Sequence, residues 1–171
     1  MISVRHLAIM QGRLLPPVDG RIQAFPREHW EQEFPRAAAA GLNAIEWIYD
    51  TYGVGANPLE TAAGVARIVA LSAEHGIVVH SVCADYFMDF AFVRAADAER
   101  AARLQHLEWL LGQADSCMTV GALATLVNVL GEAQRAPRWF LAAVRGRARR
   151  PWKGFELIAG GQTRPQLALV G

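Results

Sequence analysis

Short apolar runs alternate along this chain with longer segments whose apolar residues recur at helical spacing. Apolar runs of this length are typical of buried strands, and spacing of three or four residues is typical of amphipathic helices. We expect three strands, at His6–Met10, Leu42–Tyr49 and Ile77–Val82. We expect three helices, over about residues 27–40, 58–76 and 95–113. Each predicted strand is therefore followed by one predicted helix.

Glycine, proline and polar residues set the expected ends of these elements. Gly41 and Gly76 follow the first and second helices, where glycine commonly ends a helix. Asn57 is expected to cap the second helix, and Glu60 stands three residues later, as in a capping box. Pro35 lies inside the first helix and is expected to kink it or delay its start.

The repeat of strand and helix predicts an α/β fold with parallel strands. The strand centres near Ile9, Ile45 and Val79 are about 35 residues apart, and such units join parallel strands by right-handed crossovers. Eight units would need roughly 280 residues, close to the size of a full (β/α)8 barrel. An open doubly wound sheet is the alternative, although residues 11–14 lack the glycine-rich phosphate-binding fingerprint. The pattern alone leaves both architectures open.

Several strings in the N-terminal two-thirds resemble the sugar phosphate isomerase/epimerase family, whose members are xylose isomerase-like TIM barrels. The strings are IMQGRLLPPVDGRIQAFP at Ile9–Pro26, the W-x-x-E-F string at Trp30–Phe34, AGLNAIEWIYD at Ala40–Asp50 and HSVCADYFMD at His80–Asp89. The resemblance covers about residues 5–113. It implies that residues 1–116 form the N-terminal half of such a barrel, with the first three to four βα units. Residues 117–171 are then a divergent, irregular segment.

The resemblance implies a sugar or sugar phosphate as substrate and metal-assisted proton transfer next to a carbonyl. A divalent metal (Mn, Mg, Co or Zn) would stabilise the enediolate charge as a Lewis acid, and carboxylates would move the proton. The family's metal ligands come from the later strands, and no ligand can be identified in this sequence.

Candidate site residues are those near the carboxyl ends of the predicted strands, where parallel α/β folds place their chemistry. Glu46 is the candidate catalytic carboxylate, because burying a carboxylate in an apolar strand is costly without a purpose. A structural salt bridge with Arg13 or His80 is the alternative. The candidate substrate-binding residues are Arg13, His80, Asp85 and Trp47. For Trp47 and His80 the alternative is a place in the core.

Residues outside these strand ends are expected to have structural roles. His29, His75 and His106 are expected at the surface of helices. Cys83 and Cys117 lack metal-binding or redox spacing and are expected to be reduced thiols, as in a cytoplasmic protein. The apolar runs are too short to span a membrane.

The charge distribution changes near residue 114. Residues 1–113 carry nine Arg and thirteen acidic residues, a net −4, and residues 114–171 carry eight basic and three acidic residues, a net +5. One hypothesis is that residues 117–171 are a basic, disordered tail or the product of a truncated or frame-shifted barrel gene. The other is a genuine shortened protein with its own C-terminal segment.

Two further functions stay open at this point. One is a non-catalytic fragment or binding module whose contact surface is the basic cluster at Arg145–Lys153. The other is a metal-dependent endonuclease for abasic DNA sites, which shares the barrel, although the acidic N-terminal part disfavours nucleic acid. Half a barrel exposes strand edges, so we expect activity to need a homo-oligomer or a partner half.

Overall fold

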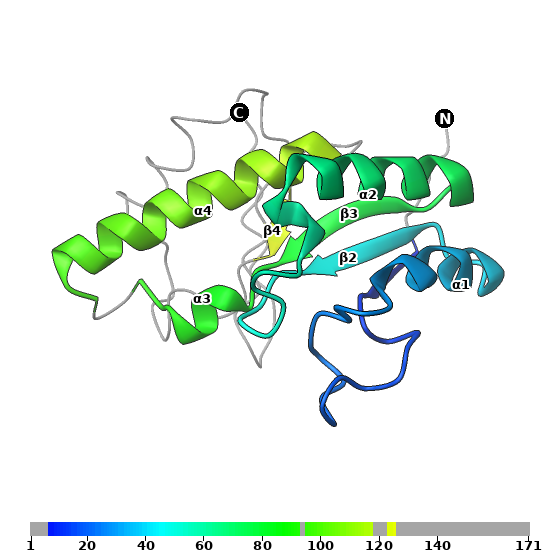
Figure 1. Ribbon diagram of the computed structural model, residues 1–171, viewed down its shortest axis with the longest axis horizontal. Coiled ribbons are helices and arrows are strands. Elements are labelled where there is room, and N and C mark those ends of the chain that lie inside the picture. The colour runs from blue at the N-terminus through cyan, green and yellow to red at the C-terminus, as the bar shows by residue number, and fades with distance from the viewer. Residues whose placement is uncertain (1–6, 93–94, 118–122, 126–171) are drawn as a thin grey trace.

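The computed structural model describes residues 7–92, 95–117 and 123–125, which form a mixed α/β fold with a parallel sheet (Figure 1). The strands are β1 (Ala8–Met10), β2 (Ala44–Ile48), β3 (Val78–Cys83) and β4 (Leu123–Thr125). The α-helices are α1 (Glu33–Ala39), α2 (Ala62–His75), α3 (Tyr86–Asp89) and α4 (Asp97–Cys117). Two 3-10 turns, η1 (Trp30–Gln32) and η2 (Pro58–Glu60), precede α1 and α2. The predicted α/β class is confirmed.

The four strands pair in sequence order, β1-β2-β3-β4, and each neighbouring pair is parallel. The strand β4 lies within the C-terminal segment whose origin the sequence leaves open. The other residues of that segment, 118–122 and 126–171, lie outside the described residues, as does the basic cluster.

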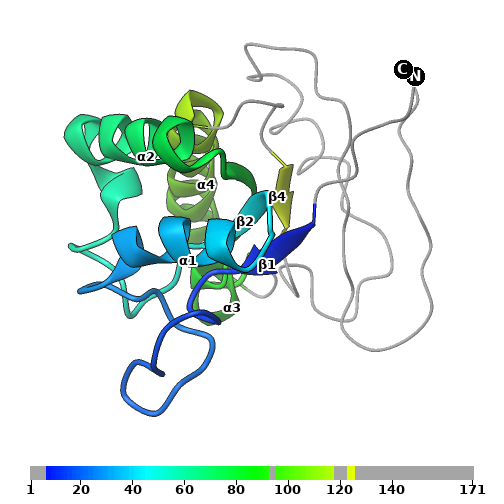
Figure 2. The same ribbon diagram turned by 90° about the vertical axis from the view of Figure 1, so that its right-hand side faces the viewer.

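The helices α1, α2 and α4 lie on the same side of the strands (Figure 2). Right-handed crossovers between consecutive parallel strands place every connecting helix on one face of the sheet, which explains this arrangement. The main core fills the space between the sheet and these helices. Its largest buried side chains include Phe25, Phe34, Ile45, Trp47 and Ile68.

The first predicted helix starts later than expected. The chain makes the 3-10 turn η1 before α1 begins at Glu33, so that Pro35 occupies the first turn of the α-helix. Proline is tolerated there because the first N–H groups of a helix have no intrahelical partner. The expected delay at this proline is therefore confirmed.

The predicted capping box at Asn57 is wrong. The Asn57 side chain caps the turn η2 by accepting from the Leu59 N–H, and Glu60 accepts from the Gly55 N–H. The helix α2 begins after Thr61, whose hydroxyl accepts from the backbone of Gly64. The 3-10 turn inserted before the helix moves the cap by four residues.

Other predictions at element ends have mixed outcomes. Gly76 ends α2 with a φ of 66°, in the left-handed region that glycine adopts readily, as expected. The segment after β3, expected as a loop, contains the short helix α3.

His106, expected at the surface, is half-buried against Tyr49 and Tyr86. Within the described part of the chain, each helix is too short or too polar to cross a membrane.

Candidate functional site

Most of the candidate residues named from the sequence lie on β2 and β3 or just beyond them: Glu46 and Trp47 on β2, His80 on β3 and Asp85 after β3. Ile45 and Trp47 both belong to the core, on the side of the helices. Because successive strand side chains point to opposite faces, Glu46 between them points to the face away from the helices. Glu46 is half-buried, so part of this carboxylate reaches that face.

Glu46 is held by a contact across the sheet. Ser81 on β3 pairs with Glu46 in register, and the Ser81 hydroxyl donates to Glu46 Oε1 at 3.1 Å. Met10 on β1 is the register partner on the other side. Charge-assisted hydrogen bonds of this kind fix a carboxylate in one orientation. Among the described residues, the structure shows no ion pair between Glu46 and Arg13.

His80 stands at an irregularity of β3. Val79 pairs with Ile45 and Ser81 pairs with Glu46, so His80 is the extra residue of a bulge between β2 and β3. Such bulges change the direction of the side chains next to them. The bulge shifts Ser81, rather than His80, into register with Glu46, where the Ser81 hydroxyl reaches the carboxylate.

Asp85 lies two residues beyond β3 and joins the end of this strand to the loop after β1. Its Oδ2 accepts from Gln23 Nε2 at 2.7 Å, and its Oδ1 accepts from the Cys83 thiol at 3.2 Å. Gln23 belongs to the long loop after β1 and is 62 residues away in the sequence. Gln23 is not among the residues expected from the sequence, because an exposed glutamine in a loop carries no local signal.

The carboxylates of Asp85, Glu46 and Asp50 all affect the buried thiol of Cys83. Burial raises its pKa far above the ordinary value, and the negative charges of Asp85, Glu46 and Asp50 raise it further. All three carboxylates are thus close enough to act on one buried sulfur. A thiol held protonated in this way is a poor nucleophile. Cys83 and Cys117 are both free and buried, in agreement with the expectation of reduced thiols.

Asp50 and Gln11 hold the loops and strands around this cluster. Asp50 is buried and accepts from the backbone N–H groups of Phe25 and Gly53, each at 2.7 Å. Burial raises the pKa of Asp50, and these hydrogen bonds oppose the rise. Gln11 Oε1 accepts from the Ile48 N–H at 3.0 Å and joins the end of β1 to the end of β2.

Arg13 and Trp47 lie in different surroundings, one exposed and the other in the core. Arg13 is exposed, and its guanidinium lies 3.8 Å from the sulfur of Met10. Trp47 is fully buried and packs against Phe25 among other core aromatic rings. Its indole N–H donates to Asn57 Oδ1 at 3.1 Å. The structure thus places Trp47 in the core beneath the helices, while Arg13 stands in solvent at the end of β1.

A divalent metal ion is one of the expectations from the sequence. Stable sites for such ions generally combine several carboxylate or imidazole ligands around one point. Among residues 7–92, 95–117 and 123–125, no group of three or more His, Cys, Asp or Glu side chains is placed to hold a metal ion. The metal therefore stays a prediction.

The side chains of Glu46, Asp85 and Gln23 combine two carboxylates with a neutral hydrogen-bonding amide. Glu46 and Asp85 can accept hydrogen bonds from hydroxyl groups or move a proton, and the Gln23 amide is a nearby donor. Compared with known proteins, the chain matches no protein-family model and no curated protein.

Proposed function

We propose that this chain forms the opening strands of a (β/α)8 barrel of the sugar phosphate isomerase/epimerase type. The sequential order β1-β2-β3-β4 and the placement of α1, α2 and α4 on one side of the sheet support this proposal. A doubly wound sheet has helices on both faces and reverses its strand order at a switch point. In a barrel the face away from the helices is the interior, and Glu46 points to that face.

The observation that carries the proposed function is a pair of carboxylates, Glu46 within β2 and Asp85 just beyond β3. Glu46, fixed by Ser81, would move a proton at the carbon next to the sugar carbonyl. Asp85, oriented by Gln23, would accept hydrogen bonds from sugar hydroxyls. Arg13 at the end of β1 would contact a phosphate, since guanidinium groups suit phosphate oxygens. His80 would contact a further hydroxyl from β3.

Binding is the first test, because it does not depend on the later strands of a complete barrel. A ketohexose phosphate is titrated into the purified chain with Mn²⁺ or Mg²⁺ present, and the heat of binding is measured. We expect Glu46→Gln to weaken binding about tenfold, the range of one charge-assisted hydrogen bond. Glu28→Gln is the matched control, because the Glu28 side chain is 81% exposed and lies on the loop before η1.

Proton transfer is measured in the same samples. Incubation in D₂O, followed by proton NMR of the substrate, reports deuterium entering at the carbon next to the carbonyl. Exchange that disappears in Glu46→Gln and persists in Glu28→Gln supports the proposed role of Glu46. A chain that neither binds the sugar phosphate nor exchanges its proton contradicts the proposed function.

A further inference from the structure

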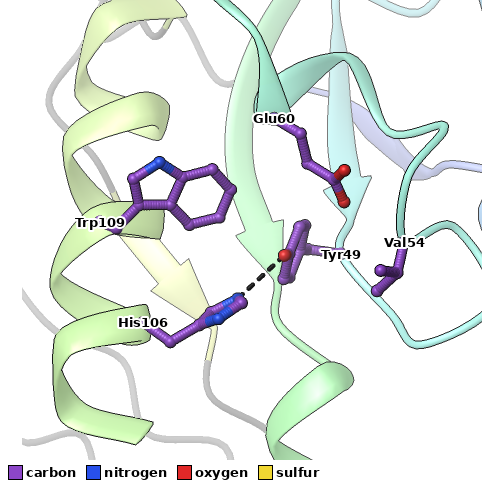
Figure 3. Close-up of a pocket in the computed structure, with 5 residues that line it drawn as sticks. All are labelled: Tyr49, Val54, Glu60, His106 and Trp109. Atoms are coloured by element: carbon purple, nitrogen blue, oxygen red, sulfur yellow. Dashed lines mark hydrogen bonds between the residues drawn. The ribbon is translucent and has the colours of Figure 1, made fainter. Parts of the chain in front are cut away.

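A pocket lies on the helix side of the sheet, away from Glu46. It has a volume of about 360 Å³ and is lined by Tyr49, Val54, Glu60, His106 and Trp109. Figure 3 shows His106 and Trp109 projecting from α4 toward Tyr49, with Glu60 and Val54 on the opposite side. Small-molecule pockets span roughly 300–1,000 Å³, so this one is large enough for a small ligand.

Aromatic rings form one wall of this pocket at steep angles to each other. The rings of Tyr49 and Trp109 are 5.9 Å apart at 60°, and those of His106 and Trp109 are 5.2 Å apart at 72°. Trp109 remains 37% exposed, so a ligand can reach its ring from solvent. Non-parallel rings around a small space can present several π surfaces to one ligand.

Contacts between Tyr49 and His106, and between His106 and Tyr86, hold these rings in place. The Tyr49 hydroxyl lies 2.9 Å from His106 Nε2, and the His106 ring stacks on Tyr86 at 4.4 Å with an interplanar angle of 8°. Burial lowers the pKa of His106, so the imidazole is neutral near pH 7 and adds no positive charge. A rigid, uncharged aromatic wall binds a ligand without a large ordering cost.

Glu60 supplies the one formal negative charge among the lining residues. Its Oε2 accepts from the Gly55 N–H at 2.8 Å. Its Oε1 is buried and has no hydrogen-bond partner among the described residues. The charge of Glu60 also contributes, after burial, to raising the pKa of Tyr49, so the carboxylate lies close to the aromatic wall. A buried oxygen without a partner is costly unless something compensates it.

We propose that this pocket binds a small organic cation of the trimethylammonium class. A quaternary ammonium group is attracted to the faces of aromatic rings, and its charge would compensate the Glu60 carboxylate. The largely apolar lining suits the methyl groups of such a ligand. A metal ion fits poorly, because Glu60 is the only carboxylate among the five lining residues. This inference is independent of the sugar-binding proposal, since the pocket lies on the other side of the sheet.

The test compares two ligands of the same shape and different charge. Choline is titrated into the full ¹⁵N-labelled chain, and the indole N–H signal of Trp109 is followed by NMR. The signal is assigned by its loss in Trp109→Phe. The control ligand is dimethylbutanol, in which a neutral tert-butyl group replaces the trimethylammonium group. We expect choline to shift the Trp109 signal in a saturable way and to bind about tenfold more tightly than the neutral analogue.

Three variants measure the contributions of Glu60 and Trp109 to choline binding separately, with the heat of binding as readout. Glu60→Gln, which keeps an acceptor for Gly55, is expected to weaken choline binding several-fold and to leave dimethylbutanol binding unchanged. Trp109→Leu is expected to weaken choline binding about tenfold, and Trp109→Phe to retain most of it. Glu74→Gln on α2, with a side chain 62% exposed, is the matched charge control.

Three results would each overturn the proposal. One is equal affinity for choline and its neutral analogue, which would mean that the pocket selects shape alone. The second is unchanged choline binding in Glu60→Gln. The third is the absence of any choline-induced shift of the Trp109 signal in a chain whose circular dichroism shows it to be folded.

Discussion

The Tyr49 hydroxyl lies 2.9 Å from Nε2 of His106, and this contact joins the end of β2 to the middle of α4. The two residues are 57 positions apart in the sequence. The ring of Tyr86 packs against both, at 5.6 Å from Tyr49 and 4.4 Å from His106. The packing of α4 on the sheet thus includes a polar contact as well as apolar burial.

A double-mutant cycle measures this contact. Tyr49→Phe removes the hydroxyl and leaves the His106 nitrogen without it, so we expect the free energy of unfolding to fall by about 1 kcal/mol. In a His106→Ala background the same change should cost less, because the partner is already absent. Urea unfolding of the four proteins gives the coupling energy. Equal costs of Tyr49→Phe in both backgrounds would contradict a direct interaction.

Glu33 predicts a pH dependence of stability. Glu33 is 1% exposed and accepts from the Gly12 N–H at 2.5 Å. Burial raises its pKa to about 7, and the hydrogen bonds from the backbone of Gly12 and Leu14 oppose this rise. Because the folded chain holds this proton more tightly than the unfolded chain, stability is lost as pH rises from about 4.5 to about 7.

The variant Glu33→Gln isolates this effect, since Gln keeps an acceptor for Gly12 and cannot ionise. Relative to the wild type, we expect the variant to gain up to about 3 kcal/mol in free energy of unfolding between pH 4.5 and pH 8. Urea unfolding of both proteins at four pH values measures the difference in their free energies of unfolding. Other groups, such as Asp50, titrate in both proteins, so their contributions cancel in this difference. A difference that does not change with pH would mean that Glu33 titrates normally in the folded chain.

Two helical glycines predict opposite effects of the same substitution. A Cβ at Gly64 in α2 would lie 2.2 Å from the carbonyl oxygen of Pro58, whereas a Cβ at Gly112 in α4 meets nothing within 4 Å. We therefore expect Gly112→Ala to raise the free energy of unfolding by about 1 kcal/mol, the ordinary helix preference for alanine. Gly64→Ala should lower it, because α2 or the turn η2 must move. Thermal unfolding of both variants is the measurement, and a stabilised Gly64→Ala would contradict the close packing of η2 on α2.

A substitution of Trp47 distinguishes a role in the core from a role in sugar phosphate binding. Trp47→Phe removes the indole N–H that donates to Asn57, and it reduces the packing against Phe25. We expect the free energy of unfolding to fall by about 1–3 kcal/mol, a usual range for such core changes. The affinity for a sugar phosphate should be unchanged, since Trp47 lies on the helix side. A lower affinity in a variant of normal stability would instead make Trp47 part of the site.

Local patterns predicted the elements well where one physical signal dominated. The apolar runs marked β2 and β3 within two residues at each end, and the left-handed conformation of Gly76 ended α2 as expected. Predictions that depended on a competing local contact were less accurate. Asn57 caps a 3-10 turn rather than the helix, because several hydrogen-bonding geometries suit the same short polar side chain.

The candidate site could be predicted only in part, because the face on which a residue lies depends on register. The expectation that functional residues lie near the carboxyl ends of the strands selected Glu46, Asp85 and His80 from the sequence. It did not reveal that Ser81, through the bulge at His80, is the hydrogen-bond partner of Glu46. Gln23 could not be predicted either, since its contact with Asp85 depends on how the loop after β1 folds over the sheet.

The sequence by itself determined the order of strands and helices and the α/β class, because periodicity and glycine positions are local properties. Only the tertiary structure decided which distant side chains meet. Glu33 shows this difference: in the sequence it is one of several acidic residues near a helix start, and in the fold it is buried under the backbone of Gly12. His106 and Tyr49 show it again, since only the packing of α4 on the sheet brings them together.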